Sequence, residues 1–351
     1  MKIIKQECWK QDLRLKEPYT IAYETISSCA NVFLRLETDT GIVGWGCAAP
    51  DLAVTGETGD SVLKKYHDIL APYLQGCDAF QYARINDELK EQMPGNPSAL
   101  AMADIALHDI MAKKAGVPLY KLLGGYRDSI LTSVTIGILP LDQSVERARD
   151  LIALGFRVLK IKGGSMVEED IAKVIKTREA VGEEIEIRFD ANQGYSVEEA
   201  IQFIHGTESA DVALLEQPTD KRNEELMKQV CQRAPIPIMA DESLMTLKDV
   251  FRLSAGDYTD MINIKLMKTG GITEALHINS VAKAGGIEVM VGCMDESALG
   301  ISAGLHFALS RRNIIYADLD GHLDLVEDPF PDTFRLESGV LYPLDKPGLG
   351  I

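Results

Sequence analysis

From about residue 130 the chain repeats one pattern, in which a short apolar, β-branched run is followed by a polar turn and a helical stretch. Strands that alternate with helices in this way are parallel, because each crossover needs a helix. We count eight such runs, at residues 132–138, 157–162, 185–190, 212–216, 236–241, 261–265, 287–293 and 315–318. No glycine-rich dinucleotide turn follows the first run. The pattern therefore favours a (β/α)8 barrel over an open doubly wound sheet.

The residues before about 125 have a different pattern of hydrophobic and polar positions. Two extended runs, 32–36 and 41–46, flank a turn and predict an antiparallel hairpin, and residues 98–115 predict a helix that ends at Gly116. We therefore predict a fold of the α/β class, a modified (β/α)8 TIM barrel with an N-terminal α+β capping domain. The predicted boundaries are 1–125 for the capping domain, 126–325 for the barrel, and 326–351 for a segment that returns to the capping domain.

Polar residues stand at the ends of the predicted strands, where a buried strand would not otherwise tolerate them. The last polar residues of the eight runs are Thr135, Lys162, Asp190, Glu216, Asp241, Lys265, Cys293 and Asp318. Neighbours in this series are 24 to 28 residues apart, the length of one strand and helix unit. We expect them to form a ring at the mouth of the barrel that carries the active site in this fold.

Three members of this ring are acidic and come from consecutive strands. Asp190, Glu216 and Asp241 would repel one another at close range unless a cation neutralised them. Ligands that are all oxygen suit Mg²⁺, which keeps positions for water or a substrate carboxylate. The alternative, that each acid caps the helix after its strand, explains one acid well and three in register poorly.

Lysines flank the acidic residues. Lys160 and Lys162 share the inward face of the second strand, and Lys265 ends the sixth, which lies opposite in an eight-stranded ring. A lysine close to a divalent cation has a lowered pKa and can act as a base, while a protonated lysine opposite can return a proton. A metal that binds the substrate carboxylate would stabilise the enediolate formed when the α-proton leaves. The arrangement predicts 1,1-proton transfer, with Lys162 and Lys265 as the catalytic pair.

The composition limits the partners and the cellular location that we expect for this protein. The net charge is −17 and the chain has no long basic run, so nucleic acid and anionic membranes are not expected partners. No run approaches the ~20 apolar residues of a membrane span and the first residues show no signal-peptide pattern, so we expect a cytoplasmic protein. The six cysteines have no zinc or disulfide spacing. Assembly into a homo-oligomer is left open.

Several short motifs resemble the enolase superfamily, and within it the muconate lactonizing enzyme subgroup. They are Gly116-Val117-Pro118-Leu119-Tyr120-Lys121-Leu122-Leu123-Gly124-Gly125, Lys160-Ile161-Lys162, Asp190-Ala191-Asn192-Gln193-Gly194, Glu216-Gln217-Pro218, Asp241-Glu242-Ser243 and Asn263-Ile264-Lys265. The resemblance extends over essentially the whole chain. It implies a capping domain on a barrel, one Mg²⁺ held by Asp190, Glu216 and Asp241, and an acid/base pair of Lys162 and Lys265.

Two further segments, 291–297 and 318–320, are similar to those of dipeptide epimerases. That family inverts the α-carbon of the C-terminal residue of a dipeptide, an isomerase reaction. The resemblance implies that Asp318 and Asp320 bind the substrate ammonium and that Lys160 polarises its carboxylate. It also implies a set of residues that line the peptide: Thr135, Cys293, Met294 and Asp295.

The substrate side chain is expected to meet the capping domain. Glu24 stands where family members that accept a C-terminal glutamate have an arginine. We therefore predict that Glu24 and Asp295 favour neutral or cationic dipeptides over Ala-Glu, although Glu24 could instead face solvent. The loop 54–58 is read either as a lid over the site or as an ordinary turn.

Other activities remain as alternatives. An o-succinylbenzoate synthase or an N-succinylamino acid racemase of the same subgroup would use the same metal and lysines, but the acidic pair Asp318 and Asp320 would repel their anionic substrates. A barrel that only binds a small ligand leaves the opposed lysines unexplained. A Schiff-base aldolase leaves the three carboxylates unexplained.

Overall fold

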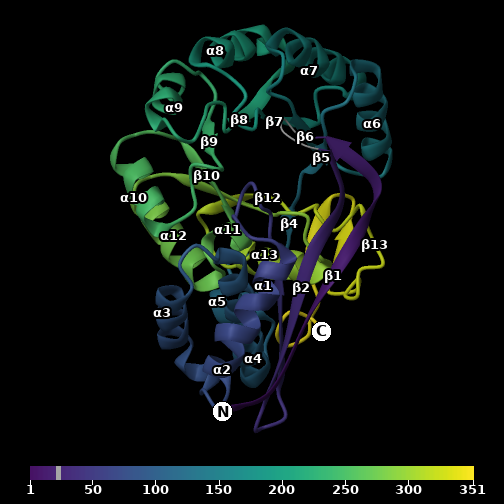
Figure 1. Ribbon diagram of the computed structural model, residues 1–351. Coiled ribbons are helices and arrows are strands. Elements are labelled where there is room, and N and C mark those ends of the chain that lie inside the picture. Colours follow the sequence, from purple (N-terminus) through teal and green to yellow (C-terminus); the bar gives the residue numbers. More distant parts are fainter. Residues whose placement is uncertain (21–24) are drawn as a thin grey trace.

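A computed structural model of the chain describes residues 1–20 and 25–351. It has two parts, a smaller unit of antiparallel strands and helices that contains the N-terminus, and a ring of parallel strands surrounded by helices (Figure 1). The predicted fold, a modified eight-stranded barrel with an N-terminal α+β capping domain, is confirmed.

The capping domain is built on a four-stranded antiparallel sheet in the order β13-β1-β2-β3. Its long strands β1 (Ile3–Thr20) and β2 (Thr25–Thr38) reach from the N-terminal end of the molecule to the barrel (Figure 1). β3 (Val43–Ala48) completes the predicted hairpin, and β13 (Leu325–Val326) pairs with β1 at Arg14 and Leu15. The C-terminal part of the chain thus contributes the edge strand of this sheet.

The longest helix of the capping domain, α4 (Pro97–Ala115), agrees with the helix predicted at residues 98–115. Pro97 occupies the first turn, where its missing N–H costs nothing, and the buried Glu57 carboxylate accepts the N–H groups of Ser98 and Ala99. Gly116 ends the helix in the left-handed conformation, at φ +72°. Glu57 ties the end of loop 54–58 to this helix, which favours the reading of that loop as a fixed turn.

The remaining capping helices are short. They are α1 (Gly59–Lys65), the π-helical turn at Tyr66–Leu70, α2 (Ala71–Leu74), the 3-10 turn at Ala79–Gln81, α3 (Tyr82–Gln92) and α5 (Leu119–Leu123). Except for α5, their apolar sides pack with α4 and the β1–β3 sheet in one buried cluster, separate from the barrel core. Leu119, Tyr120 and Leu123 of α5 belong to the cluster of the barrel core instead.

The barrel has eight parallel strands in sequence order around the ring. They are β5 (Val134–Ile136), β6 (Val158–Lys162), β7 (Glu186–Asp190), β8 (Val212–Glu216), β9 (Ile238–Ala240), β10 (Met261–Lys265), β11 (Glu288–Gly292) and β12 (Ile314–Asp318). The ring closes between its first and last strands through a bridge from Thr132 to Ala317 and a bond from Ser133 N to Ala317 O (3.1 Å). Seven of the eight predicted runs contain one of these strands, and the eighth, 315–318, lies within β12.

Helices follow the first seven barrel strands. They are α6 (Leu141–Ala153), α7 (Val167–Val181), α8 (Val197–Gly206), the 3-10 turn at Glu208–Ala210, α9 (Glu224–Cys231), α10 (Leu247–Ala255), α11 (Leu266–Thr269), α12 (Ile272–Ala284) and α13 (Ala298–Ala308). No helix follows β12, and residues 319–351 contain only turns and short strands. Two of those strands, β14 (Phe334–Glu337) and β15 (Val340–Pro343), form a sheet with β4 (Ile130–Leu131).

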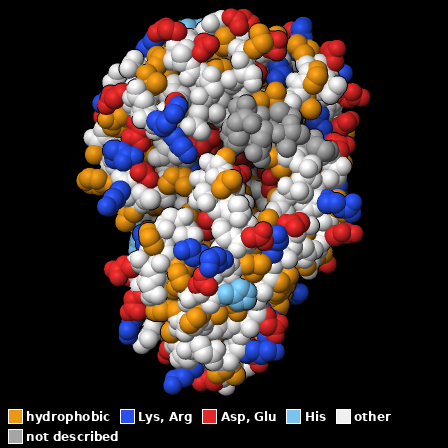
Figure 2. All heavy atoms as spheres, viewed as in Figure 1, with side chains coloured by type: hydrophobic (Ala, Val, Ile, Leu, Met, Phe, Trp, Pro, Cys, Tyr) orange, Lys and Arg blue, Asp and Glu red, His pale blue; other side chains and the backbone are white. Residues whose placement is uncertain are grey.

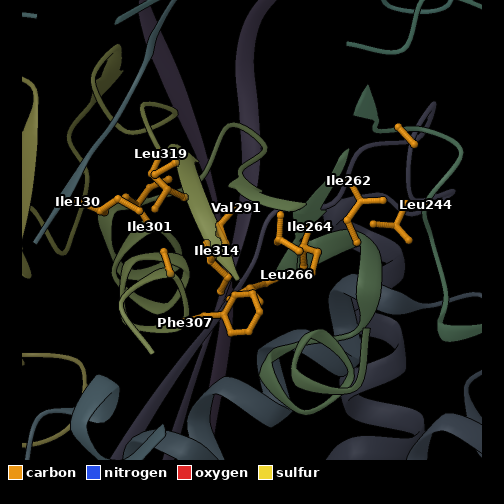
Figure 3. Packing of buried hydrophobic residues seen from close by; sticks show 14 of the residues in the cluster. Ile130, Leu244, Ile262, Ile264, Leu266, Val291, Ile301, Phe307, Ile314 and Leu319 are labelled. Carbon is orange, nitrogen blue, oxygen red and sulfur yellow. The ribbon is translucent and has the colours of Figure 1, made fainter. Parts of the chain in front are cut away.

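The barrel core lies between the strands and their helices. Val291 of β11 and Ile314 of β12 lie next to Phe307 of α13, and all three are fully buried (Figure 3). Period-two alternation sends these side chains outward to the helices and leaves the neighbouring polar residues pointing into the ring. This alternation brings the reactive polar side chains together at one end of the barrel.

The capping domain is fixed to the barrel by polar contacts that are themselves buried. The Asp109 carboxylate accepts both Trp45 N in the capping sheet and Leu349 N near the C-terminus (2.9 and 2.8 Å). The buried His108 contacts Asp104, which also accepts Thr273 N of α12. On the visible face, charged groups of both signs are interspersed (Figure 2). Among the described residues no helix is long and apolar enough to cross a membrane.

Candidate active site

A cavity of about 510 Å³ opens where the carboxyl ends of the barrel strands meet the capping domain. It contains most of the predicted site residues, and those that line it are Thr135, Lys160, Lys162, Asp241, Lys265, Cys293, Met294, Asp295, Asp318 and Asp320. Thr135 and Asp320, which are 185 positions apart in the sequence, are brought together because both lie near the carboxyl ends of strands of the same ring. Glu24 lies outside the described residues, and its predicted role stays a prediction.

The three predicted metal ligands lie side by side at the ends of β7, β8 and β9. Asp190, Glu216 and Asp241 each place one carboxylate oxygen so that all three lie within 4.8 Å of one another, and all are buried. Asp190 Oδ2 and Glu216 Oε2 accept no hydrogen bond. Burial and the neighbouring Asp190 carboxylate raise the pKa of Glu216, because negative charges at this distance destabilise each other.

Lys160 neutralises part of this charge. Its Nζ lies 3.1 Å from Asp190 Oδ2, 2.8 Å from Glu216 Oε2 and 3.0 Å from Asp318 Oδ2. Although burial opposes the charged form, the carboxylates outweigh it and raise the pKa of Lys160 well above its ordinary value. These carboxylates therefore favour the charged form of Lys160, which lines the cavity and can attract a substrate carboxylate.

Asp241 is held by two lysines from the β10 segment. Lys265 Nζ lies 2.8 Å from Asp241 Oδ2, and the buried Lys268 contacts Oδ1 and donates to the Asp241 backbone oxygen (2.6 Å). Burial alone would raise the pKa of Asp241, but the two lysines lower it. Asp241 in turn raises the pKa of Lys265 against the effect of burial. The lowered lysine pKa expected from the sequence applies to a site that holds a divalent cation, and it stays a prediction.

Lys162 and Lys265 approach the cavity from opposite sides. They end β6 and β10, which lie four places apart in a ring of eight, and both line the cavity. The turn after Lys162 is clamped by the buried Asp170 of α7, whose Oδ2 accepts Gly164 N and the Tyr195 hydroxyl (both 2.8 Å). The backbone that carries Lys162 is thus fixed by a group that does not itself line the cavity.

The acidic pair predicted to bind an ammonium group occupies the β12 side of the cavity. Asp318 is held by Lys160 and by the Ser133 hydroxyl (2.6 Å), whereas Asp320 accepts Thr135 N (2.6 Å). Burial and the nearby Asp318 raise the pKa of Asp320 to about 7. A cation brought beside Asp320 would favour its ionised form, since opposite charge lowers a carboxyl pKa.

The segment after β11 is supported from the capping domain. The fully buried Asn31 of β2 donates to the Asp295 backbone oxygen (3.0 Å), and its Oδ1 accepts Ser297 N (2.9 Å). Asp328 caps the following helix by accepting the Ser297 hydroxyl and Ala298 N (2.7 and 2.6 Å). The capping domain therefore sets the position of the Cys293 to Asp295 segment that lines the cavity.

Sequence reasoning missed several residues that hold the site. Asn263 donates to Glu216 Oε1 (2.8 Å). The buried Glu242 lines the cavity and accepts a hydrogen bond from Asn192 (3.4 Å). Asn263 stands two residues before Lys265 and so shares its inward face, a signal that was available. Lys268 lies on a helix that the strand pattern did not predict.

The donor set fits a divalent cation. It consists of three buried carboxylates from neighbouring strands, with two oxygens that lack hydrogen-bond donors, and no sulfur or imidazole ligand among the described residues of the cluster. Hard oxygen ligands of this kind suit Mg²⁺. A cation bound there would also reduce the attraction of Asp241 for Lys265.

Fold and site together define an enzyme of the capped-barrel type with a carboxylate metal centre and two opposed lysines. Models of two families match the chain, the mandelate racemase/muconate lactonizing enzyme N-terminal domain at residues 4–124 and the enolase C-terminal domain-like family at residues 143–351. The chain belongs to the mandelate racemase/muconate lactonizing enzyme family of the enolase superfamily. The predicted family is confirmed.

Its relatives include dipeptide epimerases. An L-Lys-D/L-Arg epimerase of Desulforapulum autotrophicum is 45% identical, with an alignment that covers 100% of this chain and 99% of that protein. The substrate-liganded L-Ala-D/L-Glu epimerase of Bacillus subtilis is 39% identical with a TM-score of 0.98, over 100% of this chain and 99% of that one. A dipeptide epimerase of Methylococcus capsulatus, complexed with Mg and L-Arg-D-Lys, is 37% identical over the same shares, with a TM-score of 0.95.

Proposed function

We propose that this protein is an Mg²⁺-dependent dipeptide epimerase that inverts the α-carbon of the C-terminal residue by 1,1-proton transfer. One observation carries the proposal: Lys162 and Lys265 line one cavity from opposite sides of the ring, next to the three carboxylates. A single base would suffice for elimination, whereas inversion needs a proton removed from one face and returned to the other. Names of relatives that invert dipeptides support the same reaction.

Asp190, Glu216 and Asp241 would hold the cation. When bound, Mg²⁺ would take the substrate carboxylate and stabilise the negative charge that develops when the α-proton leaves. Lys160 adds a fixed positive charge beneath the same place, since its ammonium lies within 3.1 Å of two of these carboxylates. Lys268 and Asn263 keep Asp241 and Glu216 in position.

Each of the two lysines carries out one step of the proton transfer, one removing a proton and the other returning one. For one stereoisomer a neutral Lys162 removes the α-proton and a protonated Lys265 delivers a proton to the opposite face; for the other stereoisomer the roles are exchanged. Contact with Asp241 favours the protonated form of Lys265. Closure of the cavity by the capping domain limits the access of water to the exposed α-carbon.

The opposite end of the dipeptide is assigned to the acidic pair. Asp318 and Asp320 lie on the β12 side of the cavity and would pair with the substrate ammonium. An N-succinylated amino acid has no ammonium and brings a second carboxylate to the same place. The pair therefore favours a free dipeptide over the substrates of an N-succinylamino acid racemase or an o-succinylbenzoate synthase.

The preferred C-terminal side chain is neutral or cationic rather than glutamate. Asp51 and Asp295 line the cavity on the side of the capping domain and the β11 segment, and the chain carries an overall charge of −17. Glu24, which the sequence adds to this group, would act in the same direction. A relative with 45% identity named for Lys and Arg dipeptides supports this choice.

Deuterium incorporation at the α-carbon in D₂O, followed by NMR, tests the reaction. The wild-type enzyme should exchange and invert a dipeptide in the presence of Mg²⁺, whereas Lys162→Ala and Lys265→Ala should each lose inversion. Each single variant should keep exchange from the one stereoisomer that its remaining lysine deprotonates. Lys248→Ala, at an exposed position on α10, serves as the matched control. Full turnover in both active-site variants would contradict the two-base mechanism.

A library of dipeptides with varied C-terminal residues tests the specificity. Exchange should be fastest with neutral or basic residues such as lysine, arginine or leucine, and N-succinyl-lysine should exchange more slowly than the dipeptide. Fastest exchange with X-Glu substrates would refute the assigned specificity while leaving the reaction intact. The cytoplasmic location and any homo-oligomeric state remain predictions from the sequence.

A further inference from the structure

The cavity does not end at the acidic pair. Its lining also includes a group of apolar side chains from β5, α6, the segments that flank these elements and the segment after β12, and we call this part the β5 branch. Its apolar lining residues are Val134, Ile136, Leu139, Leu151, Leu154, Phe156 and Leu323. None of them has a part in the metal site or the proton transfer.

The missing eighth helix explains why this branch exists. Val134 and Ile136 point outward from β5, on either side of the inward Thr135, toward the space that an eighth helix would help to fill. Turns of the segment after β12 cover that space instead and bring Leu323 over it. A turn fills a seam between two layers less completely than a helix, so a branch of the cavity remains.

The branch begins where the substrate ammonium is assigned. Asp320 accepts Thr135 N (2.6 Å), and Thr135 stands between the two outward residues of β5 that line the branch. In an amino acid the ammonium nitrogen and the first side-chain carbon are bonded to the same α-carbon, roughly 2.5 Å apart. An ammonium held at Asp320 therefore places the side chain of the same residue at the entrance of the branch.

The charged groups that line the branch determine which kind of substrate side chain it can bind. The charged groups of the lining outside the metal site and the acidic pair include Lys16, Glu17, Arg147 and Asp324. Arg147 and Asp324 face each other at 3.8 Å, and Lys16 Nζ donates to Leu323 O (2.8 Å). Opposite charges this close leave little net field for a charged ligand. A buried apolar wall also penalises a polar side chain that finds no hydrogen-bond partner.

We propose that the β5 branch binds the side chain of the N-terminal residue of the dipeptide, and that the enzyme prefers an apolar residue of leucine size or larger there. This inference rests on the proposed dipeptide epimerase activity and extends it to the second residue of the substrate. Filling an apolar pocket by a branched side chain in place of hydrogen should raise kcat/KM roughly tenfold or more.

A series of dipeptides tests the assignment. The C-terminal residue is held at the one that exchanges fastest, and the N-terminal residue is glycine, alanine, leucine or phenylalanine. Deuterium incorporation should give kcat/KM values that rise from glycine to leucine. Equal values across the series, or a preference for N-terminal lysine, would overturn this assignment alone. Absence of exchange with every dipeptide would overturn the proposed function and this assignment with it.

Two variants locate the effect in the branch. Leu139→Trp should fill it and reduce the ratio of kcat/KM for N-terminal leucine over glycine toward one, and Leu323→Ala should widen it and shift the preference toward phenylalanine. Both positions are half-buried, so the changes are compatible with folding. Leu122→Trp, at an exposed position on α5, is the control and should keep the wild-type ratio. An unchanged ratio in both branch variants would show that the side chain binds elsewhere.

Discussion

Gly292 at the end of β11 offers a direct test of how the metal ligands are held. A Cβ atom at this position would lie 2.5 Å from Asn263 Oδ1 and 2.8 Å from Nδ2, compared with about 3.5 Å for an unstrained contact. Asn263 is fully buried and donates to Glu216 Oε1, so its amide cannot move aside without losing that bond. Gly292→Ala should therefore displace the amide that positions Glu216.

The magnitude follows from two costs. Overpacking a filled interior costs about 1–3 kcal/mol, and loss of a hydrogen bond to a charged group costs about 1.5–3 kcal/mol. Gly292→Ala should thus lower the free energy of unfolding by roughly 3–5 kcal/mol when both act. Freeing a carboxylate ligand from its supporting amide should also weaken Mg²⁺ binding about 10- to 100-fold.

Denaturant unfolding and titration calorimetry with Mg²⁺ measure the two effects. A double-mutant cycle isolates the contact: in an Asn263→Ala background the added methyl has no amide to displace, so its cost should fall below about 1 kcal/mol. Gly304→Ala in α13 is the control for overpacking away from the metal ligands, since its Cβ would meet Leu319 Cδ2 at 2.9 Å and Val291 Cγ1 at 3.8 Å. The reasoning would be refuted if the losses of unfolding free energy in the two single variants simply added in the double variant, or if Gly292→Ala bound Mg²⁺ as tightly as the wild-type protein.

Three further predictions follow from buried groups. Asp170→Ala should release the turn after Lys162 and reduce deuterium exchange from the stereoisomer that Lys162 deprotonates by up to about 100-fold, while exchange through Lys265 changes less; equal losses for both stereoisomers would contradict this. Lys268→Met should leave the Asp241 carboxylate partly unpaired and destabilise the protein by about 3–5 kcal/mol in denaturant unfolding without metal, and added Mg²⁺ should recover part of the loss. Burial lowers the pKa of His306 to about 3, so the folded chain binds this proton more weakly than the unfolded chain does. The free energy of unfolding should therefore fall by about 1.4 kcal/mol for each unit by which the pH is lowered from 6.5 to 3. In His306→Asn this decrease in the free energy of unfolding at acid pH should be absent.

The barrel and its reactive residues could be predicted because they depend on local periodicity. Each strand has apolar residues that alternate with inward polar ones, and the repeat of 24 to 28 residues places Asp190, Glu216 and Asp241 on adjacent strands. That regularity is sufficient to bring them within 4.8 Å of one another without knowledge of the loops. The same reasoning predicted that Lys162 and Lys265 face each other.

The supporting contacts could not be predicted, because they join segments with no common period. Asn31 reaches the segment after β11 across 264 positions, and Asp170 clamps the turn after Lys162 from the following helix. The ion pair of Lys265 with Asp241 Oδ2 (2.8 Å) was also not predicted, because it depends on which carboxylate the side chain reaches. Such contacts are set by how loops and helices pack on the finished ring.

The pairing of β13 with β1 has a consequence for synthesis of the chain. The strand that borders the first sheet comes from Leu325 and Val326, and Leu119 N donates to Gly348 O (2.8 Å), so the capping domain is completed by residues near the C-terminus. A nascent chain that has emerged only to residue 125 exposes the edge of β1, which other strands can pair with. The N-terminal domain must therefore wait until residues 325–348 have been translated, and a chaperone that shields β1 during that interval would raise the yield of native protein.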